Sequence, residues 1–218
     1  MNLPNALTAA RIVATPLIAA LPFANSWPLR LIALLLFTLA AATDYIDGML
    51  ARSRKEETDL GRLLDPLADK LLLLGTLIPM YLLATTFPFV TPFGSVGLPW
   101  WVVAIVLGRE LFMTVFRQLA AKRGVVIGAI KAAKWKTTTQ LVWQGLAYGW
   151  FFAATLAAGR AWSSAAWRAF ALVIGSAGTL MMITAVGLTV YSLVLYLRGF
   201  GRIFVAPSSQ AAGRHRVP

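Results

Sequence analysis

Four aspartates that lie close together in the sequence are the residues best suited to chemistry in this chain. Seven of its eight acidic residues fall between Asp44 and Asp69, and the eighth is Glu110. In helical geometry Asp44 and Asp47 share one face of a helix, and Asp65 and Asp69 share one face of the next. We expect these two acidic faces to meet across a helical hairpin.

Converging carboxylates at the ends of apolar segments need a counter-charge. A charged side chain at the depth of a membrane span costs about 2.5–3.5 kcal/mol, and less near the interface. Carboxylate oxygens select Mg²⁺, Mn²⁺ or Ca²⁺, and four carboxylates can bracket two ions about 3.5–4 Å apart. The aspartates therefore predict a divalent-metal site. By contrast, Glu56, Glu57 and Asp59 stand among cationic residues and are interpreted as solvated loop charges.

Small residues accompany the aspartates on both faces. Gly48, Ala51 and Gly61 would let a flat group approach the backbone between the helices, and close helix packing through small residues is the alternative interpretation. Beside paired metal ligands, a metal-chelated nucleotide diphosphate explains them better. Arg52 would then bind phosphate, because its guanidinium is forked and permanently charged.

The composition places these residues in a membrane protein. The 218 residues are 59% hydrophobic with a mean hydropathy of +0.73, and only 13% are charged. This excludes disordered, collagen-like and coiled-coil chains and argues against a water-soluble domain. Because the chain has no cysteine, disulfides, thiolate metal sites and cysteine nucleophiles are excluded. The net charge of +12 is attributed to loops at the membrane surface rather than to nucleic-acid binding.

Six apolar runs are long enough to cross a membrane, and turn residues separate them, notably in the loop at 87–99. The connections after the first, third and fifth runs should lie on one side of the membrane, and the only cations at them are Arg30, Arg160 and Arg168. The other 17 Lys and Arg residues lie on the side of the two termini and the acidic segment, so both termini should face the cytoplasm. We expect an all-α integral membrane protein with six transmembrane helices in residues 1–205 and a disordered basic tail at 206–218. The runs are Leu7–Phe23, Leu29–Leu50, Leu63–Thr85, Leu98–Ala120, Trp135–Ala158 and Ala169–Leu197.

The acidic segment reads Asp-x2-Asp-Gly-x2-Ala-Arg-x8-Gly-x3-Asp-x3-Asp. This pattern resembles the signature of the CDP-alcohol phosphatidyltransferases at every defined position. The resemblance implies six transmembrane helices, a homodimer and two bound ions of Mg²⁺ or Mn²⁺. It assigns Asp69 as the catalytic base. It also implies metal binding by Asp44, Asp47, Asp65 and Asp69, and CDP binding by Gly48, Ala51, Arg52 and Gly61.

The reaction that the resemblance implies is attack by an alcohol hydroxyl on the phosphorus attached to diacylglycerol, with release of CMP. The donor, CDP-diacylglycerol, would keep its acyl chains in the lipid. We expect a multi-pass protein of a bacterial inner membrane, and by the positive-inside rule the acidic segment, and with it the active site, should face the cytoplasm.

Basic residues later in the sequence bear on which alcohol is accepted. Arg109 and Arg117 lie within the fourth apolar run, and three lysines precede the fifth, so an anionic acceptor is favoured. Positive-inside topology with binding of anionic lipid head groups is the alternative. Glu110 shares a helix face with Arg117, and we expect the two to pair. The lysines are Lys131, Lys134 and Lys136.

Three local strings resemble the phosphatidylglycerophosphate synthase subgroup of that family: Asn5-Ala-Leu-Thr8-x-x-Arg11, Gly108-Arg109-Glu110 with Arg117, and Lys134-Trp-Lys136-Thr137. That subgroup uses glycerol 3-phosphate. The resemblance therefore implies that the acceptor phosphate is held by Arg109, Arg117, Lys134 and Lys136.

The first apolar run carries a polar stripe of Thr8, Arg11 and Thr15. These side chains could approach the nucleotide or the acceptor, which makes Thr8 a further candidate for CDP binding. Capping and anchoring of the first helix is an equally good interpretation.

Several functions remain open at this point. Inositol phosphate, serine or phosphatidylglycerol could replace glycerol 3-phosphate as the acceptor. Intramembrane aspartates could also line the pathway of a divalent-cation transporter, but the fifth and sixth apolar runs contain no acidic residue. A non-catalytic membrane scaffold leaves the converging aspartates unexplained.

Overall fold

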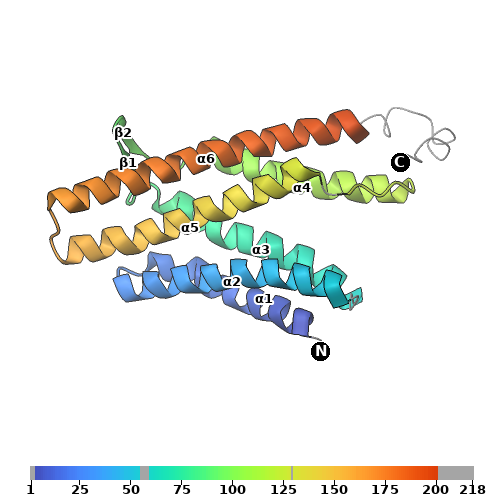
Figure 1. Cartoon of the computed structure of the whole chain (residues 1–218), viewed down its shortest axis with the longest axis horizontal. Helices are drawn as coiled ribbons and strands as arrows, with labels where there is room; N and C mark the ends of the chain where they lie inside the picture. Colours follow the sequence, from blue (N-terminus) through green and yellow to red (C-terminus); the bar gives the residue numbers. More distant parts are fainter. Residues whose placement is uncertain (1–2, 55–58, 129, 201–218) are drawn as a thin grey trace. The chain divides into compact units, whose positions relative to one another are not determined.

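The described part of the protein is mostly helical, as Figure 1 shows for a computed structural model in which about 82% of the described residues are helical. The structure describes residues 3–54, 59–128 and 130–200. Within these ranges, residues 3–4, 44–54 and 59–63 are described by their backbone alone. The tail expected at 206–218 lies outside these residues. The elements are α1 (Leu3–Ala20), η1 (Leu21–Phe23), α2 (Trp27–Arg54), α3 (Asp59–Leu83), β1 (Phe89–Thr91), β2 (Gly94–Val96), α4 (Trp100–Lys122), α5 (Lys131–Gly159) and α6 (Ala165–Phe200).

The helices form two compact units. The first unit comprises Met1–Pro99 and Leu141–Leu180, and so contains α1, η1, α2, α3, both strands and adjoining parts of α5 and α6. The second comprises Trp100–Gln140 and Met181–Pro218, with α4 and the remaining parts of α5 and α6. A single membrane domain over 1–205 stays a prediction.

Within the described residues, four helical segments are long and apolar enough to cross a membrane. The apolar part of α2 stops at Thr43, where the acidic segment begins, and α4 carries Arg109, Glu110 and Arg117 among its apolar residues. The all-α membrane class is confirmed, and six crossings stay a prediction. The four segments are Asn5–Phe23, Leu64–Leu83, Lys131–Gly159 and Ala165–Phe200.

Large aliphatic side chains cover the outside of these helices. Val13 of α1 is 72% exposed and Val173 of α6 is 66% exposed. Water-soluble monomers rarely leave such continuous apolar surface uncovered. Lipid is the solvent that suits these helix faces.

Two prolines leave backbone carbonyls in the first unit without their helical donors. Pro22 and Pro79 have no N–H, so the carbonyls of Ile18 and Gly75, four residues earlier, cannot form the usual α-helical bond. The buried Tyr148 hydroxyl of α5 lies 3.0 Å from Ile18 O and 3.3 Å from Gly75 O, and it donates its proton to one of them. Tyr148 therefore ties α5 to both α1 and α3.

Helices α1 and α3 approach closely at the same level. A Cβ on Gly75 would come 2.6 Å from Cγ2 of Thr15, so a larger residue fits only if the Thr15 side chain moves. Phe37 of α2 stacks on the Tyr148 ring with the centroids 5.6 Å apart. The close approach at Gly75 and the bonds of Tyr148 thus fix how α1 packs on α3. This packing determines which side chains of the two helices meet nearer their N-terminal ends.

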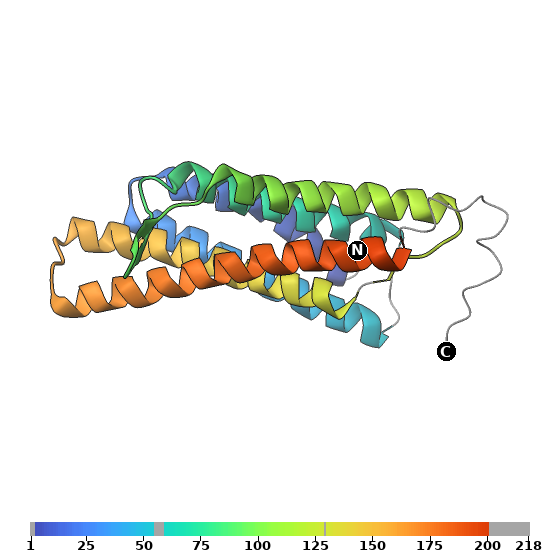
Figure 2. The same cartoon turned by 90° about the horizontal axis from the view of Figure 1, so that it is seen from above.

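The loop expected at 87–99 contains a short antiparallel hairpin of β1 and β2, in which Val90 faces Ser95. The hairpin lies beside the first half of α6 in both views (Figure 1, Figure 2). A Cβ on Gly178 would come 2.5 Å from the Phe89 ring, and one on Gly175 would overlap the Val90 backbone. The two glycines of α6 therefore let the hairpin backbone pack directly on the helix.

Replacing Tyr148 with Phe removes the hydroxyl that lies against these two carbonyls while keeping the ring. We expect the free energy of unfolding to fall by about 1–3 kcal/mol, the cost of a buried unsatisfied polar group, measured by thermal unfolding of the purified protein in detergent. Tyr81→Phe is the matched control, because Tyr81 is an exposed tyrosine of α3. Equal midpoints for the two variants would contradict the role given to Tyr148.

Candidate active site

The polar stripe of α1 lies against the aspartates of α3, within the first unit. Thr8 Oγ1 donates a hydrogen bond of 2.8 Å to Asp65 Oδ1, and Arg11 forms an ion pair of 3.1 Å with Asp69 Oδ1. Thr8 is 1% exposed and Arg11 3%, whereas both aspartates are exposed. The donors are thus buried in the contact between the helices, and the carboxylates face outward from it.

The spacing of the residues explains this match. Thr8, Arg11 and Thr15 recur at three and four residues, and Asp65 and Asp69 at four, so each set forms one helical stripe. The two stripes meet in the order of the sequence, which means that α1 and α3 run parallel. Thr15 continues the stripe inward, where its hydroxyl donates to the Arg11 carbonyl at 2.8 Å. These contacts anchor α1 on α3, whereas capping of α1 and contact of the stripe with a ligand stay predictions.

The other two aspartates lie in the last turns of α2. Helix α2 ends at Arg54 and α3 begins at Asp59, and Figure 1 draws these two ends at the same end of the first unit. Asp44 stands ten residues before the end of α2 and Asp69 ten residues after the start of α3, or about 15 Å along each helix. The backbone therefore brings both acidic pairs to the same level.

The side chains of Asp44 and Asp47 lie outside the described residues. The same holds for the predicted CDP-binding residues Gly48, Ala51, Arg52 and Gly61, so their roles stay predictions. Among the side chains that are described, no group of three or more potential metal ligands occurs. Of the four aspartates, only Asp65 and Asp69 have described side chains. Exposed carboxylates at one helix end are oxygen donors of the kind that Mg²⁺ and Mn²⁺ prefer.

In the second unit, Glu110 gathers two buried cations. Its carboxylate accepts a 2.9 Å hydrogen bond from Arg109 and pairs with the Lys136 ammonium. Arg109 is 7% exposed and Lys136 4%. Arg109 also donates to the Ser192 hydroxyl of α6 at 3.2 Å. Each of these two buried cations is therefore paired with the same carboxylate.

The expected pair between Glu110 and Arg117 is wrong. Arg117 donates instead to the Tyr196 hydroxyl at 3.1 Å, with its guanidinium 5.5 Å from the ring centroid. Seven residues separate Arg117 from Glu110, a rise of about 10 Å along the helix. Lys136 comes within reach of the Glu110 carboxylate from α5, whereas Arg117 reaches α6.

Tyr196 is the centre of a second set of bonds in this unit. Its hydroxyl accepts the Ile130 N–H at 3.2 Å and donates to the Gly128 carbonyl at 3.2 Å. The ring is fully buried among apolar side chains that include Met113 and Phe116. Tyr196 thus fixes the loop between α4 and α5 and the position of Arg117.

The predicted acceptor-phosphate residues divide into two groups. Arg109, Arg117 and Lys136 are brought together around Glu110 and Tyr196, and these three cations with one carboxylate carry a net charge of +2. Lys134 is exposed and forms no side-chain hydrogen bond or ion pair with any residue that the structure describes. Sequence reasoning did not find Ser192 and Tyr196. The signal was available, because Ser192 and Tyr196 are four residues apart and so lie on one face of the mostly apolar α6.

Comparison with known proteins identifies relatives over much of the chain. The profile of the family described as CDP-alcohol phosphatidyltransferase matches residues 1–191. A protein of Arabidopsis thaliana named CDP-diacylglycerol–glycerol-3-phosphate 3-phosphatidyltransferase 1, chloroplastic/mitochondrial, is 34% identical over 94% of this chain and 64% of its own length. A protein of Cereibacter sphaeroides with the same activity in its name is 37% identical over 65% of this chain and 60% of its own length.

A third relative carries a different name. The protein named cardiolipin synthase (CMP-forming) of Oryza sativa subsp. japonica is 32% identical over 94% of this chain and 59% of its own length. The chain therefore spans 59–64% of the length of these three relatives.

The Glu110 cluster makes a prediction about stability. Glu110→Gln leaves the cations of Arg109 and Lys136 buried without their counter-charge, and we expect a loss of up to about 3–5 kcal/mol in the free energy of unfolding. Adding Lys136→Met to Glu110→Gln should restore part of that loss, since one buried charge is then removed.

A double-mutant cycle in thermal unfolding measures this coupling. Lys131→Met is the control, because Lys131 is an exposed lysine at the start of the same helix. Additive losses for Glu110→Gln and Lys136→Met would show that the ion pair does not stabilise the unit.

Proposed function

The chain belongs to the CDP-alcohol phosphatidyltransferase family, and from this premise we propose that it transfers the phosphatidyl group of CDP-diacylglycerol to glycerol 3-phosphate, with release of CMP. The product is phosphatidylglycerophosphate. One observation carries the proposal: the two acidic pairs lie at the same end of the first unit. There Asp65 and Asp69 of α3 lie against α1, at the level of Asp44 and Asp47 of α2. The names of the Arabidopsis and Cereibacter relatives support the choice of acceptor.

Divalent metal is the cofactor that this site requires. The family is generally dependent on divalent metal ions, and four carboxylates at one helical hairpin are a donor set that fits two ions of Mg²⁺ or Mn²⁺. Asp44, Asp47, Asp65 and Asp69 would hold them. When bound, the ions supply positive charge to the pyrophosphate and to the departing CMP.

The protein's own groups then have separate tasks. The acceptor hydroxyl attacks the phosphorus that carries diacylglycerol, the bond from that phosphorus to CMP breaks, and Asp69 takes the hydroxyl proton. Arg11 holds the Asp69 carboxylate in place, and Thr8 does the same for Asp65. Gly48, Ala51, Arg52 and Gly61 line the CDP site, with Thr8 beside them.

The acceptor phosphate is bound by the cations of the second unit. Three clustered cations and one carboxylate leave a charge of +2, which complements the dianion of glycerol 3-phosphate. Arg109, Arg117 and Lys136 bind it, and exposed Lys134 joins them. The surplus positive charge supports a phosphate-bearing acceptor over serine.

A second acceptor has one observation in its favour. The rice relative named cardiolipin synthase (CMP-forming) matches as much of the chain as the first Arabidopsis protein does. The same chemistry with phosphatidylglycerol as the acceptor is therefore the alternative. A divalent-cation transporter has no comparable support, because the family is one of transferases.

The proposed setting is a bacterial inner membrane. Six helices cross it, both termini and the aspartates face the cytoplasm, and two copies form a homodimer. The clustering of Lys and Arg in residues 52–70, 109–136 and 198–216 supports this orientation. A site at the membrane surface suits a donor whose acyl chains remain in the bilayer.

Asp69→Asn tests the catalytic base. We expect CMP release to fall by about 10²–10⁴-fold, the usual contribution of a positioned general base, while metal-dependent binding of CDP-diacylglycerol persists. Asp44→Asn and Asp65→Asn should weaken both. Asp59→Asn, the same change at the first residue of α3, should release CMP at the wild-type rate. Wild-type turnover in Asp69→Asn would exclude it as the base.

Arg117→Ala tests the acceptor site. Purified protein with CDP-diacylglycerol and Mg²⁺ or Mn²⁺ is given glycerol 3-phosphate, phosphatidylglycerol, inositol phosphate or serine, and CMP release is compared. We expect release with glycerol 3-phosphate, and a rise of about ten-fold in its KM for Arg117→Ala, as for one lost hydrogen bond to a charged group. Lys122→Ala is the control. If Arg117→Ala changed only the KM for CDP-diacylglycerol, these cations would be assigned to the donor instead of the acceptor.

A further inference from the structure

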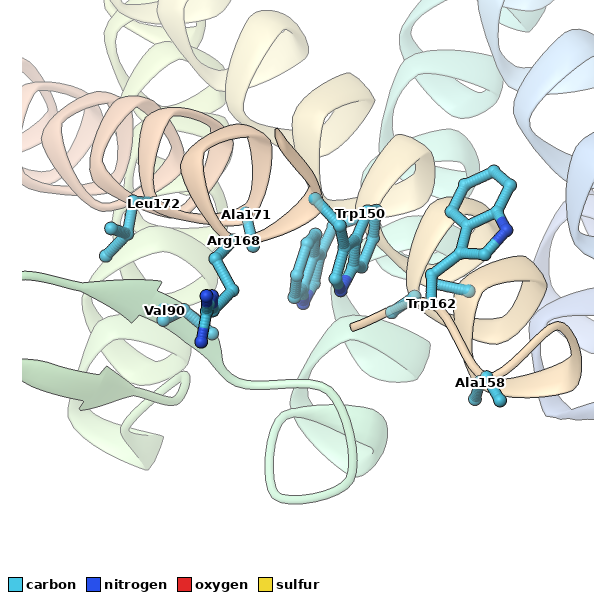
Figure 3. A pocket seen from close by; sticks show the side chains of 11 residues that line it. Val90, Trp150, Ala158, Trp162, Arg168, Ala171 and Leu172 are labelled. Atoms are coloured by element: carbon cyan, nitrogen blue, oxygen red, sulfur yellow. The ribbon is translucent and has the colours of Figure 1, made fainter. Parts of the chain in front are cut away.

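A cavity of about 580 Å³ lies in the first unit, beside the connection between α5 and α6 (Figure 3). Its volume falls in the range of small-molecule sites, about 300–1,000 Å³. Alanines of α5 and α6 form much of the lining, and Val90 of β1 contributes to it. Trp150, Trp162 and Trp167 add aromatic surface, and Arg168 is the only charged residue of the lining.

The aromatic wall is held in place by packing. The rings of Trp150 and Trp167 stack with centroids 5.9 Å apart and planes 5° from parallel, and Trp162 meets Trp167 edge-on at 5.8 Å. Trp150 is 5% exposed and donates its indole N–H to the Pro88 carbonyl at 3.0 Å. The site is therefore formed before any ligand binds.

The turn after α5 folds Trp162 back toward the cavity. The Trp162 N–H bonds to the Ala157 carbonyl at 2.9 Å, and the Ala161 N–H bonds to the Ala158 carbonyl at 3.2 Å. These two bonds define a Schellman motif, whose left-handed position usually holds glycine. Here Ala161 occupies it with φ +50°, an unfavourable conformation for a residue with a Cβ. The chain accepts this strain at a residue that lines the cavity.

Arg168 gives the cavity its charge. The side chain is exposed, and Figure 3 draws its guanidinium next to Val90, on the side of the cavity away from Trp162. Its guanidinium forms no hydrogen bond or ion pair with another side chain among the residues that the structure describes. An apolar wall with one available cation at its edge suits a ligand that has an apolar body and an anionic head.

The cavity lies far from the aspartates within the first unit. Asp65 and Asp69 are near the start of α3, whereas β1 follows its end. The 25 residues of α3 span about 37 Å, and the hydrocarbon core of a bilayer is about 30 Å thick. Tryptophan and arginine beside apolar surface are typical of the boundary between hydrocarbon and head groups. The cavity thus belongs to the opposite membrane surface.

We propose that this cavity binds an anionic glycerophospholipid from the leaflet opposite the aspartates. Part of an acyl chain lies on the alanine wall, the phosphate is held by Arg168, and Trp162 and Trp167 lie at the level of the glycerol. The inference goes beyond the proposed transferase activity and does not depend on it.

The test uses the full chain in vesicles and phospholipids brominated in the acyl chain, which quench tryptophan fluorescence on contact. Brominated phosphatidylglycerol is titrated into phosphatidylcholine, with brominated phosphatidylcholine in a parallel series. We expect saturable quenching by the anionic lipid, reduced when Trp162 and Trp167 are replaced by Phe. Arg168→Gln should require about five-fold more anionic lipid, as for one basic residue at a membrane surface.

Two further variants complete the test. Arg160→Gln is the matched control, because Arg160 is an exposed arginine of the same connection that does not line the cavity. Ala158→Phe fills the cavity from its exposed edge and should abolish the saturable quenching, while CMP release stays at the wild-type level.

Three outcomes would overturn the proposal. One is equal quenching by brominated phosphatidylglycerol and brominated phosphatidylcholine. Another is the same titration curve for Arg168→Gln and Arg160→Gln. The third is a change of oligomeric state in Ala158→Phe with quenching unchanged, which would assign the cavity to a second copy of the chain.

Discussion

The contact of buried Thr8 and Arg11 with Asp65 and Asp69 is the interaction on which the rest of the first unit depends. A guanidinium in an apolar helix contact is costly unless a carboxylate is beside it, so α1 has one favourable register on α3. Tyr148 and the close approach at Gly75 hold that register at deeper levels. The aspartates are therefore held at the end of a rigid pair of parallel helices.

The same constraint applies to three other buried cations among the described residues. Arg109 and Lys136 share Glu110, and Arg30 donates to the Pro22 carbonyl at 2.9 Å and to Thr155. Within a lipid bilayer, a buried charged side chain needs a partner inside the protein. Asp65, Asp69 and Arg168 are exposed charged groups near helix ends, where a ligand can add charge from outside the protein. The proposed metal and lipid sites lie at these positions.

Much of this could be predicted from the sequence, because helix length and acid spacing are local properties. The six apolar runs correspond to α1–α6, and the acidic stripes fall at the end of α2 and the start of α3. Partners between distant segments could not be predicted. Glu110 had several cations within plausible reach, and nothing local selects Lys136 over Arg117. The role of Tyr148 can be recognised only once the structure places Pro22 and Pro79 near it. The hairpin in 87–99 has strands of three residues, which are too short to show the alternation of a β-strand in the sequence.

The central claim is that the acidic ends of α2 and α3 share bound divalent metal. Its most direct test is a titration of the purified protein with Mn²⁺ in the presence of CDP-diacylglycerol, followed by electron paramagnetic resonance. We expect about two ions per chain, as in two-metal sites, and a loss of at least one of them in both Asp44→Asn and Asp65→Asn. Unchanged Mn²⁺ binding in either variant would contradict the account.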